Sequence, residues 1–334
     1  ALYTRSATVL KVHEDRTFPG ALVASLSIPW GEASNSRGGY HLVWSRDLVE
    51  SAGALLAIGA VAEARQVLTY LISTQQADGH WLQNQWLGGK AFWQGVQLDE
   101  TGFPVLLAAA LQAEQALDGI AINDMLRRAL GFIFREGPAT GQDRWEEDGG
   151  VNPFTLAVAI AALVEGGELL GGKARDCALL LADYWNACLE DWTFVSGTDL
   201  ARKYGVSGYY LRIAPQDVLS HAGAMNEWVM IKNRANDPHL PAEEQVATDF
   251  LQLCRYGLRR ADDPHMRDSI KVMDALLKTD TPSGPAWHRY NGDGYGEHPD
   301  GSPFDGSGRG RAWPLLVGER GHFALLAGED ALPY

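Results

Sequence analysis

A short stretch from Asp143 to Gly150 carries residues whose types and spacing suit proton transfer. It reads Asp-Arg-Trp-Glu-Glu-Asp-Gly-Gly, so two adjacent carboxylates follow a tryptophan and precede a Gly-Gly turn. Ionisable groups on a loop that a rigid element holds are frequent catalytic acids. The indole of Trp145 also offers a flat apolar face of the kind that packs on a sugar ring. An acidic triplet alone is more often a set of solvated acids near a helix N-terminus, where the macrodipole favours negative charge.

The composition restricts the partners that this chain can bind. Its 334 residues carry 28 Lys and Arg against 42 Asp and Glu, a net charge of −14, which argues against nucleic acid. Eleven tryptophans and eleven tyrosines, several of them beside Gly, Asp or Arg, are typical of a cleft that binds sugars. The length is sufficient for a large core and would allow two domains. We expect a single helical domain over residues 1–334.

Cysteine usage and hydrophobic runs exclude several other classes. Cys177, Cys188 and Cys254 are an odd number and lack the spacing of metal ligands. We expect no apolar run long enough for a membrane span, and the N-terminus lacks a basic-then-apolar signal pattern. We therefore expect no membrane partner and no structural disulfide.

Helical periodicity and breaker residues predict the elements that must position the acidic stretch. Arg46 and Asp47, at the start of the second helix, either pair structurally or face a ligand, and Ser45 is the predicted N-cap. Two long loops, Asp191–Pro215 and Thr281–Gly310, follow pairs of helices. The predicted helices are Leu2–Asp15, Ser45 to about Gly59, Val61–Thr74, Asp99–Leu117, Met125–Phe134, Pro153–Leu170, Ala174–Leu189, Gln216–Ile231, Pro241–Leu258, Pro264–Leu277 and a last helix opened by Trp313.

Helical pairs with loops on one side favour a closed α/α toroid, with an open bundle or a solenoid as the alternatives. Strand signals are scarce and lie between helices. The expected fold class is therefore all-α.

Two motifs resemble the glucoamylase family, glycoside hydrolase family 15. One is Asp-Arg-Trp-Glu-Glu at 143–147 followed by Phe154-Thr155, and the other is Tyr40-x-x-x-Trp44-x-Arg46-Asp47. The segment from Pro19-Gly20-Ala21 to Pro29-Trp30 and the sequence Gly-Glu-Arg-Gly-His at 318–322 are most similar to the bacterial branch of glucoamylases and glucodextranases. The resemblance implies an (α/α)6 toroid and an inverting exo-acting hydrolase. Such an enzyme releases glucose from the non-reducing ends of α-glucans through α-1,4 or α-1,6 bonds.

The resemblance also implies a role for each matching residue. Glu146 would be the general acid, and Glu147 a ligand-binding carboxylate beside the scissile bond. The terminal glucose would be clamped by Tyr40, Trp44, Arg46 and Asp47. Trp93 would brace the acid, Trp145 would form an apolar wall, and Arg289 and Trp313 would contact the sugar.

One part of the family pattern has no match. The family's general base is a glutamate that follows the segment resembling residues 318–322, and no residue of this sequence corresponds to it. We therefore expect a toroid that is incomplete at its C-terminus, with the base outside this chain and a second fragment as a candidate partner. The β-rich N-terminal domain of the bacterial members also has no counterpart here.

Several alternatives stay open at this stage. A saccharide-binding fragment without the base, a transglucosylase and an α,α-trehalase would each use the same clamp. The substrate would be an α-glucan or an oligosaccharide, and the chemistry needs no cofactor. Asp300, Asp305 and neighbouring carbonyls offer the oxygen ligands that calcium prefers, but Gly-Asp loops are more often simple turns, so we predict no metal site. The family resemblance implies a secreted or periplasmic protein.

Overall fold

The computed structural model describes residues 2–26 and 39–334. The Pro29-Trp30 pair that contributes to the family resemblance lies outside the described residues. Two compact units make up the chain, and the prediction of one domain over 1–334 stays a prediction. Unit 1 contains Ala1–Gly137 and Ala159–Asp183, and unit 2 contains Pro138–Val158 and Tyr184–Tyr334.

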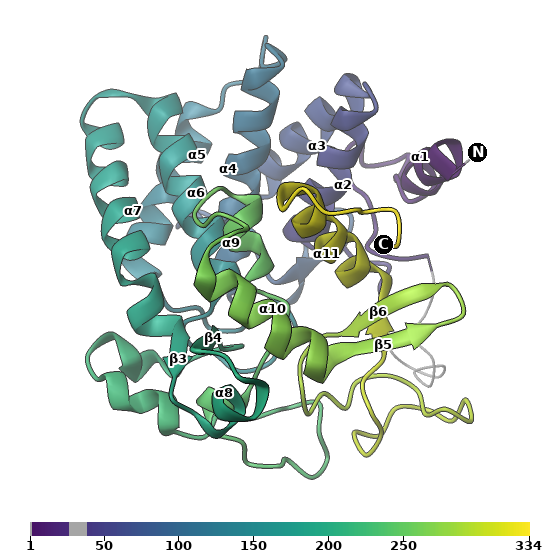
Figure 1. Ribbon diagram of the computed structural model, residues 1–334. Coiled ribbons are helices and arrows are strands. Elements are labelled where there is room, and N and C mark those ends of the chain that lie inside the picture. Colours follow the sequence, from purple (N-terminus) through teal and green to yellow (C-terminus); the bar gives the residue numbers. More distant parts are fainter. Residues whose placement is uncertain (1, 27–38) are drawn as a thin grey trace. The chain divides into compact units, whose positions relative to one another are not determined.

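Helices are the main elements of the described residues, and the strands are short (Figure 1). The α-helices are α1 (Leu2–Val12), α2 (Ser45–Ala57), α3 (Val61–Thr74), α4 (Leu98–Ala113), α5 (Asn123–Glu136), α6 (Pro153–Leu170), α7 (Gly172–Thr193), α8 (Asp199–Tyr204), α9 (Leu251–Arg255), α10 (Pro264–Leu277) and α11 (Pro314–Leu326). The strands are β1 (Asn84–Gln85), β2 (Ala91–Trp93), β3 (Phe194–Ser196), β4 (Gly208–Tyr210), β5 (Lys278–Thr281), β6 (Gly284–His288) and β7 (Ala312–Trp313). This content confirms the all-α prediction.

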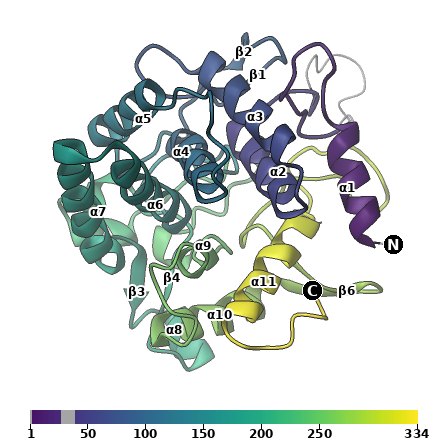
Figure 2. The ribbon, with the colours of Figure 1, turned by 90° about the horizontal axis from the view of Figure 1, so that it is seen from above.

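Unit 1 is built on α2, α3 and α4, which lie side by side, with α5 packed on α4 (Figures 1 and 2). The sequence of α5 explains its orientation, because Met125, Ala129 and Ile133 recur at helical spacing and are all buried. The bounds predicted for α3 are confirmed. The prediction that Ser45 caps α2 is wrong. Trp44 is the N-cap residue, and the Ser45 hydroxyl instead donates to the main-chain oxygen of Glu100 at 3.1 Å.

Helix α6 corrects the reading that no segment is apolar enough to span a membrane. Its residues Pro153–Leu170 reach that length and hydropathy, but 67% of the window is buried inside the protein. A helix that is hydrophobic all round is also the expected core helix of a large helical domain. The composition of α6 thus follows from the burial of most of its residues, with Glu165 and Glu168 exposed.

Unit 2 combines short antiparallel strands with α9, α10 and α11. Strands β3 and β4 pair Phe194 with Tyr210, and β5, β6 and β7 form a three-stranded sheet in that order. The sheet lies against α10 and α11 (Figure 1). Helix α10 begins as predicted, since Asp263 accepts a hydrogen bond from the His265 N–H at 2.8 Å and proline follows the cap.

Four predicted elements of unit 2 are wrong, and one of them is the loop predicted at 281–310, which contains β6 and the last residue of β5. Residues 216–231 contain two 3₁₀ turns, Gln216–Leu219 and Ala222–Asn226, in place of one helix. Residues 241–258 contain a 3₁₀ turn and the five-residue α9. The predicted loop 191–215 contains β3, α8 and β4. In each case apolar residues are buried by tertiary contacts that local periodicity does not reveal.

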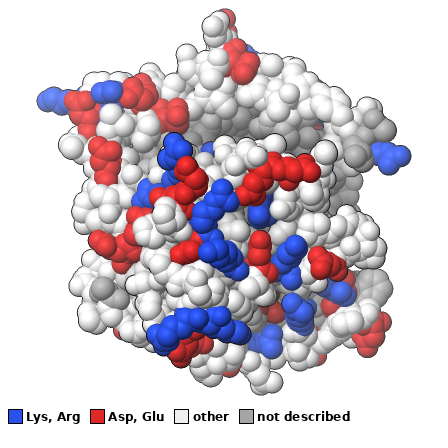
Figure 3. Space-filling view, viewed as in Figure 1, with Lys and Arg blue, Asp and Glu red and all other residues white. Residues whose placement is uncertain are grey.

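On the face of the molecule drawn in Figure 3, Lys and Arg side chains are interspersed with Asp and Glu. Mixed charge of this kind lacks the single-sign stripe with which proteins track a phosphate backbone.

Candidate active site

The acidic stretch forms a closed loop in unit 2. The main chains of Thr140 and Gly150 exchange both hydrogen bonds, at 2.8 and 2.9 Å, and this pairing closes the base of the loop. One carboxylate oxygen of Asp143 accepts the N–H groups of Trp145 and Glu147, at 2.9 and 3.0 Å. The other accepts from Arg212 at 2.8 Å. Asp143 therefore fixes the main chain on both sides of Glu146.

Glu146 stands at the tip of this loop in an unusual conformation. Its φ angle is 63°, in the left-handed region that residues other than glycine rarely adopt. Its main-chain N–H closes a tight turn by donating to the main-chain oxygen of Asp143 at 3.0 Å. Its side chain is half-buried. A strained, well-held residue of this kind is a frequent feature of catalytic sites.

Glu147 points into the protein and is fully buried. Its carboxylate accepts from the main-chain N–H groups of Lys232 and Asn233, at 2.5 and 3.2 Å, and from the Asn233 amide at 2.7 Å. The Tyr290 hydroxyl also donates to it. Burial raises the pKa of Tyr290 well above its ordinary value, which keeps the phenol protonated as a donor. Glu147 thus anchors the loop, and its predicted contact with a ligand stays a prediction.

Arg289 lies beside the loop in a cage of aromatic rings. Its guanidinium pairs with both oxygens of Asp293, at 2.8 and 2.7 Å. Its carbon is 5.3 Å from the ring centre of Trp145 and 5.6 Å from that of Trp313, with Tyr290 and Tyr295 completing the cage. Within the described residues its third nitrogen, Nη1, donates no hydrogen bond. This nitrogen is a suitable donor for a ligand hydroxyl.

The structure thus brings three predicted residues together in unit 2. The ring centres of Trp145 and Trp313 are 5.6 Å apart, and Arg289 lies over both rings. Sequence reasoning missed Tyr295, whose ring centre lies 6.4 Å from that of Trp313. The many aromatic residues of the loop around 281–310 were the feature of the sequence that could have indicated Tyr295.

The predicted clamp residues lie in unit 1, at the start of α2. The ring centres of Tyr40 and Trp44 are 6.0 Å apart. Arg46 donates from Nη1 to Gln97 and to Asp99, both at 2.8 Å. The Asp47 carboxylate lies 3.9 Å from Nε of Arg46, and 47% of its side chain is exposed. Arg46 is therefore held in place by the protein, while Asp47 is accessible to a ligand.

Two buried carboxylates that sequence reasoning missed surround Arg46. Asp99 and Glu100 are both fully buried at the start of α4, and Glu100 lies 3.1 Å from Nη1 of Arg46. Burial raises the pKa of Glu100 to about 8, against the opposing attraction of Arg46. The adjacent acids at the start of a predicted helix were the only available signal.

Trp93 occupies β2 of unit 1, and 47% of its surface is exposed. The main-chain N–H of Trp93 donates to Oδ1 of Asn84 at 2.9 Å, and this bond fixes strand β2. Its ring contacts that of Phe92, with centres 5.1 Å apart. Its predicted role as a brace for the acid stays a prediction.

Asp300 and Asp305, the candidates for calcium, close local turns. Asp300 accepts from the N–H and hydroxyl of Ser302, at 3.0 and 2.7 Å. Asp305 accepts in the same way from Ser307, at 2.8 and 2.7 Å, and these bonds lower the pKa of Asp305 to about 2. Across the described residues no three His, Cys, Asp or Glu side chains gather as metal ligands.

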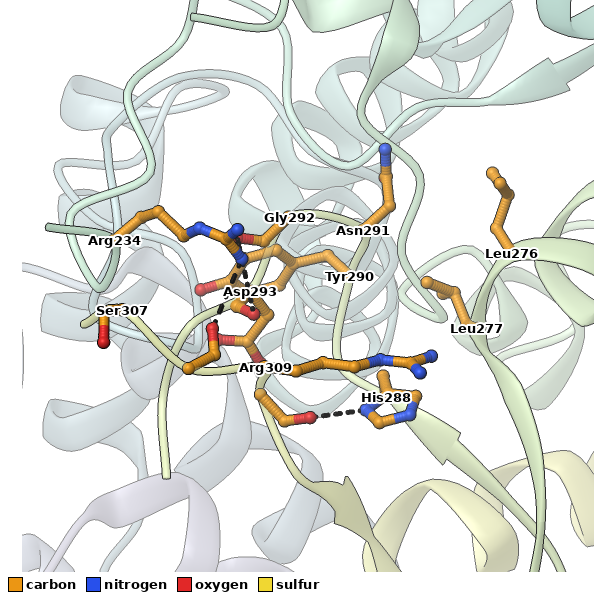
Figure 4. A pocket seen from close by; sticks show the side chains of 12 residues that line it. Arg234, Leu276, Leu277, His288, Tyr290, Asn291, Gly292, Asp293, Ser307 and Arg309 are labelled. Atoms are coloured by element: carbon orange, nitrogen blue, oxygen red, sulfur yellow. Dashed lines mark hydrogen bonds between the residues drawn. The ribbon is translucent and has the colours of Figure 1, made fainter. Parts of the chain in front are cut away.

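A cavity of about 480 Å³ lies elsewhere in unit 2 (Figure 4). Arg234, His288, Tyr290 and Arg309 are among its lining residues, and Glu146 is not. Arg234 is turned toward the main chain and donates to the oxygen of Gly292 at 3.2 Å (Figure 4). The cavity shares Tyr290 with the network around Glu147, and the Asp293 carboxylate in its lining is paired with Arg289.

Comparison with known proteins gives a consistent result. The model of the glycosyl hydrolases family 15 matches residues 1–83 and 73–328. A glucoamylase of Clostridium sp. (strain G0005) is 38% identical over 344 residues, which cover 100% of this chain and 46% of that protein. The crystal structure of a bacterial glucoamylase complexed with acarbose is 39% identical, with a TM-score of 0.87 over 100% of this chain and 48% of that one.

A more distant structure, a glucoamylase from Saccharomycopsis fibuligera, has a TM-score of 0.63 at 15% identity and supports the fold alone. These matches confirm the predicted (α/α)6 fold class and the resemblance read from the motifs. The chain spans about half the length of the bacterial relatives that it matches.

Proposed function

This chain belongs to glycosyl hydrolases family 15, and on that premise we propose that it carries the general acid of an inverting, exo-acting α-glucan hydrolase. The enzyme would release glucose from the non-reducing ends of an α-glucan or oligosaccharide. The reaction needs an acid, a base and a water molecule, and no cofactor.

The observation that carries this proposal is the way in which the loop presents Glu146. Hydrogen bonds to Asp143 hold the residues on either side, while Glu146 itself takes a left-handed conformation at the tip. Strain of about 1–3 kcal/mol persists only where the surroundings enforce it. A carboxyl held in this way is prepared to give its proton to the leaving glycosidic oxygen. Glu147, in contrast, has its carboxylate occupied by protein donors.

Each unit supplies groups that suit a sugar. In unit 2 the rings of Trp145 and Trp313 offer apolar faces, and Nη1 of Arg289 offers a charged donor. In unit 1 Asp47 offers an exposed acceptor, and Arg46 is held by Asp99. The groups of unit 1 support the clamp that the family resemblance assigned to the terminal glucose, and those of unit 2 support the sugar contacts that it assigned to Arg289 and Trp313.

We place the general base outside the 334 residues. Glu319, on α11, is a carboxylate near the segment that the family's base follows, but both of its oxygens are bound to Arg144, at 2.6 and 3.1 Å. A carboxylate in such a pair is unsuited to activating water. The chain by itself would then bind glucose-type ligands far better than it hydrolyses them, with turnover lower by about 10²–10⁴-fold. Adding a fragment that supplies the base should restore turnover.

The decisive experiment follows the products by NMR. The protein that contains this chain is given maltose, isomaltose and trehalose in separate assays, and the anomer of the first glucose released from the first two is recorded. Inversion predicts β-glucose from either substrate, and the ratio of the two rates defines the preferred linkage. Appearance of α-glucose would refute the inverting mechanism. Longer oligosaccharides would identify a transglucosylase, and hydrolysis of trehalose alone an α,α-trehalase.

A further inference from the structure

We propose that Glu319 is a positioning residue for the general acid and that it acts through Arg144. The inference rests on the proposed function, since it concerns the orientation of the loop that carries Glu146. All of the residues involved belong to unit 2.

Arg144 connects the acid loop to two other segments. Its Nη1 and Nη2 donate to the two oxygens of Glu319, at 2.6 and 3.1 Å, so the pair is bidentate. Its Nε donates to Asp249 at 2.8 Å, and Nη2 also lies 3.2 Å from the Thr248 hydroxyl. All three guanidinium nitrogens thus have partners on α11 or just before α9.

Aromatic rings fix the plane of the same guanidinium. Its carbon lies 4.5 Å from the ring centre of Trp145 and 4.3 Å from that of Phe154, which is in the first turn of α6. Cation–π contacts of this kind add to the hydrogen bonds and restrict rotation of the group. Because Arg144 is two residues before Glu146, its placement constrains the turn on which the acid stands.

Because the cluster is buried, the positive charge of Arg144 needs a carboxylate close to it. The side chain of Arg144 is 3% exposed and that of Glu319 is 7% exposed. Burial also raises the pKa of Asp249 to about 6, so at acidic pH Asp249 is largely neutral. Asp143 is the other carboxylate near the cluster, and it is already paired with Arg212. Glu319 is therefore the carboxylate that meets Arg144 through both of its oxygens.

The test is Glu319→Gln in the protein that contains this chain, with Glu190→Gln as the matched control. Glu190 also forms a bidentate pair, with Nε and Nη2 of Arg259, both at 2.6 Å, but it lies on α7 away from the loop. Both variants should lose stability. Two substrates are compared at the same fraction of folded protein: maltose, and α-glucosyl fluoride, whose leaving group departs without a proton.

A misplaced acid should affect only the substrate that needs protonation. We expect Glu319→Gln to lower kcat on maltose about 10–100-fold with little change in KM, and to leave α-glucosyl fluoride within about threefold of wild type. Glu190→Gln should leave both rates unchanged. Equal losses on the two substrates, or no loss on maltose, would overturn the positioning role.

Two further controls keep the outcome interpretable. If Glu319→Gln does not fold, Glu319→Asp keeps the charge but shortens the reach, and it should show a smaller loss that is again confined to maltose. Wild-type protein that hydrolyses neither substrate would refute the proposed function itself. Glu146→Gln supplies the reference pattern for complete loss of the acid.

Discussion

Asp143 and Arg212 form an ion pair that the protein encloses completely: their closest atoms are 2.8 Å apart and neither side chain is exposed. The same aspartate accepts two N–H groups of the acid loop, and the same arginine donates from Nε to Gln245 at 2.9 Å. The pair therefore joins the loop that carries Glu146 to the chain beyond β4.

Removing one partner of this pair should be costly. Arg212→Met would leave the Asp143 carboxylate buried without its counter-ion, which typically costs about 3–5 kcal/mol. Denaturant unfolding should show this loss. Arg260→Met is the control, because Arg260 forms an exposed pair with Asp262 and should change stability little. Equal effects of the two substitutions would contradict a structural role for the buried pair.

Gly150 should tolerate no side chain. Its φ angle is 149°, and an added Cβ would lie 2.1 Å from the main-chain oxygen of Ala214. Gly150→Ala should therefore disturb the pairing that closes the acid loop and lower both Tm and kcat. Gly119→Ala is the control, since Gly119 has a φ of 77° with no atom near its Cβ. Gly119→Ala should lower the free energy of unfolding only by the cost of a left-handed backbone conformation, about 1–2 kcal/mol. A larger loss at Gly119 would contradict this reading.

Asp47 should contribute to binding more than to folding. Its side chain is 47% exposed and 3.9 Å from Arg46, so Asp47→Ala removes an accessible acceptor. If it holds the terminal glucose, calorimetry with a glucose-like inhibitor should show a loss of about 1–3 kcal/mol of binding energy. The unfolding midpoint should stay close to that of the wild type. The reverse pattern, lower stability with unchanged affinity, would identify Asp47 as a residue that only stabilises the helix start.

Glu100 should make stability depend on pH. Burial raises its pKa from the ordinary 4.5 to about 8, so the folded protein binds a proton more tightly than the unfolded chain. The contribution of Glu100 is then complete below pH 4.5 and is lost as the pH rises through 8. Between pH 5 and pH 8 the wild type should lose more free energy of unfolding than Glu100→Gln. Parallel pH profiles for the two proteins would show that Glu100 does not titrate in this window.

The sequence allowed prediction of the long helices with clear signals. Pro264 after Asp263 marks the start of α10, and Pro314 after Trp313 marks that of α11. Residues 216–231 were mispredicted because a buried apolar residue of the segment, Val229, packs with Ile213 and Ala242, which lie on either side of it in sequence. Helical periodicity does not distinguish such a segment from a helix.

The candidate acid could be located from its motif, but the groups that hold it could not. Arg144 meets Asp249 and Glu319, which are 105 and 175 residues away in sequence. Nothing in the local sequence around Glu319 indicates such a partner. Likewise, the left-handed conformation of Glu146 follows from the bonds of Asp143 and not from any property of glutamate.

The most direct test of the account is to introduce Glu146→Gln into the protein that contains this chain and to measure its kcat on maltose. Glutamine keeps the size of the side chain but has no proton to give to the leaving oxygen. The account predicts that kcat falls by about 10²–10⁴-fold while the Kd of a glucose-like inhibitor stays within a few-fold of wild type. Unchanged kcat on maltose would show that another group protonates the leaving oxygen and would contradict the assignment of Glu146 as the acid.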